Sequence, residues 1–90
     1  MNVALPGKHI SATFRKNSYY RSDILENQAY MICVGLQVKP IRIERVQTAR
    51  NSSIQIVFEK PIVYTPRQSL VVLRPDNQGT RIIGQGTIIG

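Results

Sequence analysis

Apolar residues recur at every second position along much of the chain, and this period of two predicts β-strands. The clearest case is Ile54, Ile56 and Phe58, which alternate with the residues between them. In residues 8–14, the apolar positions begin at Ile10 and again fall on every second residue. Successive side chains of a strand point to opposite faces, so each segment has one face suited to a core.

Two further segments, residues 29–34 and 70–73, are apolar at nearly every position. Such a run is typical of a strand that crosses the middle of a closed or double-layered sheet. Residues 38–47 show a less regular pattern, because the apolar phase shifts at Val46 and Pro40 cannot donate to a ladder. We therefore expect an edge strand with a bulge or bend there.

The second half of the chain is divided by turn-forming residues. Residues 59–61 interrupt the alternation, so residues 62–64 are expected to form a short strand of their own. Residues 75–79 give the strongest turn signal, with Gly79 able to adopt a positive φ. The loops are expected at residues 17–27 and 48–52.

Gly84 and Gly86 interrupt the β-branched run of the last strand, residues 81–89. A glycine inside a strand marks a tight bend or the close approach of another backbone, as in a crowded barrel.

No stretch keeps a helical period, whereas short strands follow one another between Pro, Gly and Asn turns. The sequence therefore predicts an all-β fold, a small closed antiparallel β-barrel of six to seven strands. The side chains expected inside it are Ile54, Ile56, Phe58, Leu70, Val72 and either Ile82 or Ile83.

Composition limits the function. Ninety residues with 42% hydrophobic content make one domain, residues 1–90, which is too small for an enclosed substrate cleft beside a second domain. The formal net charge of +7 favours a polyanionic partner, with nucleic acid the first candidate. The alternative is that Lys and Arg only solvate the outside of the barrel.

The residues needed for catalysis are scattered or missing. His9 is the single histidine and the five carboxylates are dispersed, so a proton relay, a metal site and a cofactor site are not expected. The chain has no phosphate-binding loop, and Cys33, its only cysteine, is expected to be a small core residue. The small size and the missing nucleotide-binding loop lead us to expect that the chain is not an enzyme. No segment approaches the roughly 20 apolar residues of a membrane span, and the N-terminus lacks a signal-peptide pattern, so we expect a cytoplasmic location.

Basic residues fall at strand ends and turns. Lys60, Arg74 and Arg81 are placed in this way, and the backbone amides at Gly79 and Thr80 could add donors to a row of phosphates. If these cations cluster on one open face, RNA binding is favoured, and if they are dispersed, protein interaction is favoured.

Three signatures occur in order: Glu59-Lys60-Pro61-Ile62, then Leu70-Val71-Val72-Leu73-Arg74, then Gly79-Thr80-Arg81-Ile82-Ile83-Gly84-Gln85-Gly86-Thr87-Ile88. They resemble the lysine-proline-valine, hydrophobic-arginine and glycine-x-glycine strands in the C-terminal β-barrel, or third domain, of EF-Tu-like translational GTPases. The closest likeness is to the selenocysteine-specific elongation factor and the gamma subunit of initiation factor two.

The resemblance implies an RNA-facing or interdomain module of a tRNA-carrying GTPase, excised from a larger factor and partnered by its GTPase domain and second barrel. It implies that Gln28, Lys60 and Gly79 contact the T-stem of tRNA, with Arg74 and Arg81 nearby. The family's tyrosine-x-proline-glutamine entry reads Leu25-Glu26-Asn27-Gln28 here. The alternatives are a barrel that packs against sister domains or a partner factor, and a stand-alone ribosome-associated barrel.

Overall fold

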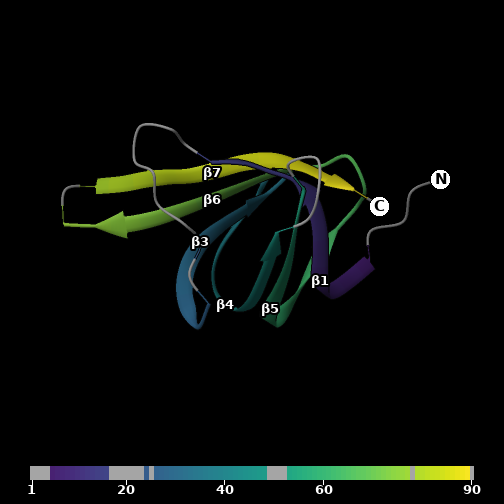
Figure 1. Cartoon of the computed structure of the whole chain (residues 1–90), viewed down its shortest axis with the longest axis horizontal. Coiled ribbons are helices and arrows are strands. Elements are labelled where there is room, and N and C mark those ends of the chain that lie inside the picture. Colours follow the sequence, from purple (N-terminus) through teal and green to yellow (C-terminus); the bar gives the residue numbers. More distant parts are fainter. Residues whose placement is uncertain (1–4, 17–23, 25, 49–52, 78, 90) are drawn as a thin grey trace.

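The computed structural model describes residues 5–16, 24, 26–48, 53–77 and 79–89, and within these ranges it contains β-strands and no helix (Figure 1). The all-β prediction is therefore confirmed. The strands are β1 (Leu5–Thr13), β2 (Arg15–Lys16), β3 (Gln28–Val34), β4 (Gln37–Thr48), β5 (Ser53–Tyr64), β6 (Ser69–Asp76) and β7 (Gly79–Ile89).

The strands form one antiparallel sheet in the order β1-β5-β4-β3-β6-β7-β2. The sheet closes on itself because β1 also pairs with β7, where Ser11 lies opposite Ile89 and Ala12 opposite Ile88. β2 continues the chain beyond β1 and pairs with β7 farther along. The closed antiparallel barrel expected from the sequence is thus confirmed, with six strands in the ring and β2 as an extension.

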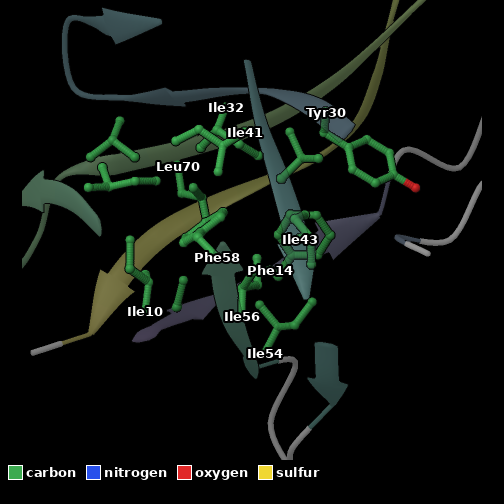
Figure 2. Packing of buried hydrophobic residues seen from close by; sticks show 14 of the residues in the cluster. Ile10, Phe14, Tyr30, Ile32, Ile41, Ile43, Ile54, Ile56, Phe58 and Leu70 are labelled. Carbon is green, nitrogen blue, oxygen red and sulfur yellow. The ribbon is translucent and has the colours of Figure 1, made fainter. Parts of the chain in front are cut away.

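One hydrophobic cluster fills the barrel, and Figure 2 shows its side chains gathered from different strands. The sequence predicted that either Ile82 or Ile83 points into the barrel. In the structure Ile83 is 1% exposed and Ile82 is 42% exposed, so Ile83 is the interior residue. A β-bulge between Val72 and Leu73 on the β6–β7 ladder explains why Ile83 turns inward. The predicted interior residues that the structure confirms are Ile54, Ile56, Phe58, Leu70, Val72 and Ile83.

The prediction that residues 38–47 form an edge strand is wrong, because β4 lies between β3 and β5. The expected bulge is present, as the β4–β5 register shifts between Ile43 and Arg45. Pro40 is tolerated because β4 pairs with β5 only from Ile43 to Thr48, so the stretch around Pro40 has β3 as its only neighbour.

Residues 62–64 are not a separate strand, since β5 runs without a break from Ser53 to Tyr64. The irregularity expected at residues 59–61 takes another form. The ladder with β1 passes from Val57 opposite His9 to Ile62 opposite Gly7, so the intervening part of β5 is unpaired there. A strand can stay continuous across such a change in register if its apolar side chains point into the core again beyond it. Ile62, which is buried, does so.

The two glycines of the last strand lie where β1 turns into β2, and the predicted close approach of another backbone is confirmed. A Cβ atom on Gly86 would overlap the carbonyl oxygen of Thr13. A Cβ on Gly84 would overlap the ring of Phe14 and come within 2.8 Å of the Arg15 carbonyl oxygen. Side chains at these positions would therefore push β1 and β7 apart.

Cys33 is half-buried, because it lies on the face of β3 that points away from the core residues Ile32 and Val34. The prediction that it belongs to the core is therefore wrong. The loops expected at residues 17–27 and 48–52 fall mostly outside the described residues.

Phe58→Ala is expected to lower the free energy of unfolding by about 3–5 kcal/mol, because Phe58 is fully buried in the barrel. Urea unfolding followed by far-ultraviolet circular dichroism measures the change. Gln55→Ala, on the exposed face of the same strand, is the control and should change stability by less than about 0.5 kcal/mol. Equal effects of the two substitutions would contradict the assigned core.

Gly86→Ala is expected to cost about 3 kcal/mol or more, because the added methyl group meets backbone that cannot move without opening the barrel. Gly79→Ala tests a different cost, since Gly79 has φ 128° and open space around it, and should lose only about 1–2 kcal/mol through backbone strain. Denaturant unfolding of both variants gives the comparison. If Gly86→Ala is the milder change, the closure does not depend on this contact.

Candidate binding surfaces

The β6–β7 hairpin extends beyond the barrel, as Figure 1 shows at the left of the view. Pairing of β6 with β3 ends at Leu73 opposite Met31, and pairing of β7 with β2 ends at Gly84 opposite Lys16. Among the described strands, residues 74–76 and 79–81 therefore pair only with each other, and they are called here the β6–β7 arm.

Two arginines occupy one side of this arm. Arg74 lies directly opposite Arg81 in the ladder, and both are exposed. Residues directly opposite in an antiparallel pair share a face, and like charges there repel. Gly79, with its positive φ, closes the arm opposite Asp76.

The other two predicted site residues lie elsewhere. Lys60 is exposed on β5, on the wall of the barrel across from β6, since β4 and β3 separate them on one side and β1 and β7 on the other. Gln28 is exposed at the start of β3, which neighbours β6, but β3 and β6 pair only from Met31 onward. The fold thus brings together Gly79, Arg74 and Arg81 but leaves Lys60 remote from them. The three cations are therefore only partly clustered: Arg74 and Arg81 share one face, as expected for RNA binding, whereas Lys60 is dispersed from them.

The residues just before β3 have structural tasks. The Val46 N–H donates a hydrogen bond of 3.2 Å to Oε1 of Glu26, next to the β4 bulge. Arg42 Nη2 donates to the carbonyl oxygen of Asn27 at 3.1 Å, and Asn27 adopts φ 59°. These bonds support the bulge and the turn. Asn before a strand is a sequence signal for such a turn, and the sequence prediction did not use it.

The outer side of the barrel carries an apolar surface that the sequence prediction missed. Register places two rows of outward-facing residues across β4, β3, β6 and β7. The first row is Pro40, Met31, Leu73 and Ile82. The second row is Val38, Cys33, Val71 and Gln85. The sequence signal for this apolar surface was the continuous apolar character of residues 29–34 and 70–73. Because the barrel buries only one face of each strand, the other apolar side chains of these segments face outward.

A groove borders this surface. It lies between the corner of β1 and β2 and the outer side of β6 and β7, and Val71 and Gln85 belong both to it and to the second row. Arg15 at its rim is exposed. The residues that line it are Thr13, Phe14, Arg15, Ser69, Val71, Gln85, Gly86 and Thr87.

Within the described ranges, no group of His, Cys, Asp and Glu side chains is arranged to hold a metal ion. His9 is exposed on β1, and its carbonyl oxygen accepts a hydrogen bond of 3.2 Å from the Tyr64 hydroxyl. The second groove of the barrel contains His9 and Glu26, but the carboxylate of Glu26 already accepts the bond from Val46.

A scan against models of protein families and a search of curated proteins each gave no match to this chain. The part of the chain that the structure describes has no helix capable of crossing a membrane. The link to translation factors therefore rests on the sequence signatures alone, and the fold and its surfaces carry the functional argument.

Proposed function

We propose that this barrel is an RNA-facing module of a tRNA-carrying translation factor, acting in the cytoplasm and contacting the backbone of the acceptor arm or T-stem. The observation that carries the proposal is the β6–β7 arm, on which Arg74 and Arg81 lie side by side next to the glycine turn. Arginine is suited to phosphate because its planar guanidinium can donate two parallel hydrogen bonds.

The chemistry of the arm favours contact with the sugar-phosphate backbone. Recognition of single-stranded RNA uses exposed aromatic side chains on which bases stack. Among the described aromatic residues, Phe14, Tyr30 and Phe58 are buried, and the half-buried Tyr64 donates its hydroxyl hydrogen to His9. A projecting pair of cations on a two-stranded hairpin suits the phosphates of a structured RNA.

Lys60 has a different role in this proposal from the one that the resemblance implies. From the opposite wall of the barrel it adds to the net charge of +7, which attracts RNA at a distance, but it does not share a contact surface with the arm. Gln28 is exposed at the start of β3, outside the ladder that joins β3 to β6, and in this proposal it is a polar residue that could make a second contact apart from the arm.

The wider setting follows from the resemblance. The signatures around Lys60, Arg74 and Gly84 support membership in a factor whose GTPase domain and second barrel share the tRNA. A module with one arm of contact then binds weakly alone, because a small interface provides limited affinity.

Replacing Arg74 and Arg81 together by alanine is expected to weaken binding to a hairpin RNA that mimics an acceptor and T-stem. Each phosphate contact contributes close to one unit to the slope of log K against log salt, so the double variant should lose about two units of slope. Fluorescence anisotropy over a series of salt concentrations measures affinity and slope together.

Lys60→Ala provides the matched control, since it removes a cation from the opposite wall. It should lower affinity slightly and leave the slope within about half a unit. If the arginine double variant retains the full slope, or if Lys60→Ala reduces it as much per cation removed, the arm is not the RNA contact and the proposal is wrong.

A further inference from the structure

We infer that the outer side of β4, β3, β6 and β7 is a docking surface for a protein partner whose contacting side chains are apolar and acidic. The surface consists of the apolar members of the two rows described above and is called the outer apolar face. Its residues are Val38, Pro40, Met31, Cys33, Val71, Leu73 and Ile82.

The outer apolar face is continuous. Hydrogen-bonded register carries it from Pro40 through Met31 to Leu73, and a second row runs beside it from Val38 to Val71. Val38 is 60% exposed and Ile82 is 42% exposed at the two ends of the surface, whereas the central side chains are half-buried by their neighbours. Contiguous apolar surface of this kind marks interaction sites more often than isolated exposed residues do.

The opposite wall of the same barrel shows that this composition is not general. There the outward positions of β1, β4 and β5 include four polar residues: His9, Ser11, Gln47 and Gln55. Gln55 lies opposite both Ser11 and Gln47, and His9 lies opposite Val57. A barrel solvated on all sides would alternate apolar and polar residues in every strand. β3 and β6 depart from that alternation, whereas the outward apolar residues of β5, Val57 and the 42% exposed Val63, are separated by Glu59 and Pro61.

Charge decides which partner fits. Arg42 flanks the outer apolar face on the β4 side, where it lies opposite Ala29, and Arg15 stands at the rim of the groove on the other side. The described carboxylates are Glu26, Glu44 and Glu59, and none belongs to the two rows. Carboxylates around an apolar centre would complement these cations, and complementarity of this kind sets partner choice.

A second copy of the chain is a poorer occupant. Each copy carries a formal charge of +7, and a face-to-face dimer would bring the arginines at both borders of one copy toward the other. Like-charge juxtaposition is the usual means by which an interface rejects a wrong partner.

The groove between the β1–β2 corner and the outer side of β6 and β7 adjoins the outer apolar face. It extends from Val71 and Gln85 toward Arg15, and the paired residues Ser69 and Thr87 also line it. An apolar side chain of the partner can therefore lie on the outer apolar face while a neighbouring carboxylate of the partner reaches Arg15. Arg74 and Arg81 directly follow the Leu73–Ile82 pair in the β6–β7 ladder and point to the other side, so protein and RNA can be bound at once.

The test is a selection from a library of short random peptides on the 90-residue chain, with depletion on a variant carrying Val38→Lys and Ile82→Lys. The matched control carries Gln47→Lys and Gln55→Lys, which adds the same charge on the polar wall. Two added lysines attract an acidic peptide more strongly, so any loss of binding in the first variant reports the apolar contact. The selected peptides are then measured individually by anisotropy.

The expected peptides combine apolar residues with a net negative charge, bind the chain and the control alike, and bind the Val38→Lys, Ile82→Lys variant at least about tenfold more weakly. Circular dichroism should show both variants folded, and a Val38→Ser, Ile82→Ser variant replaces the first if it is not. The inference is wrong if no peptide distinguishes the variants, or if those that do are basic or purely polar. Sedimentation that shows a dimer broken by Val38→Lys and Ile82→Lys would also overturn it, by making a second copy the occupant.

Discussion

The architecture depends on one close contact, the passage of the last strand beneath the corner where β1 turns into β2. Gly86 and Gly84 allow it, because any side chain there would overlap Thr13 or Phe14. Thr13 then completes the closure, as its Oγ1 accepts a hydrogen bond of 3.0 Å from the Thr87 N–H. Without this contact β1 and β7 would be open sheet edges with unpaired backbone groups, and the core would lose one wall.

The β6–β7 arm follows from the same contact. β7 is 11 residues long, but closure and pairing with β2 use only its second half, from Gly84 onward. Among the described strands, its first half has β6 as its only neighbour, so the two strands continue outward as a ribbon. The bulge at Ile83 separates the two halves of β7. It places the Ile83 side chain in the core, and the residues after it pair with β1 and β2 to close the barrel. The position of Arg74 and Arg81 is thus a consequence of where the barrel closes.

A second irregularity protects the barrel where β4 and β5 separate. Their ladder ends at Ile43 opposite Phe58, which leaves Pro40 on one strand and Pro61 on the other beside the gap. Proline cannot donate to an added strand, so these residues discourage pairing with another chain. Gln37 bridges the far end of the gap, with Nε2 donating to the Val63 carbonyl oxygen at 2.6 Å.

The sequence alone determined most of the strands, most of the inward residues and the role of the paired glycines, because period-two alternation and glycine placement are local signals of backbone direction and crowding. It was wrong about a separate strand at residues 62–64 and about Cys33. The sequence could not determine which strands lie next to one another in the sheet. The edge position expected for residues 38–47 was wrong because the course of β5 decides whether a strand has a second partner. Lys60, Arg74 and Arg81 look equivalent as cations at strand ends, yet only register pairs two of them and puts Lys60 on the other wall. The outer apolar face was likewise visible as apolar runs, but which side faces the core depends on long-range pairing that no local pattern contains.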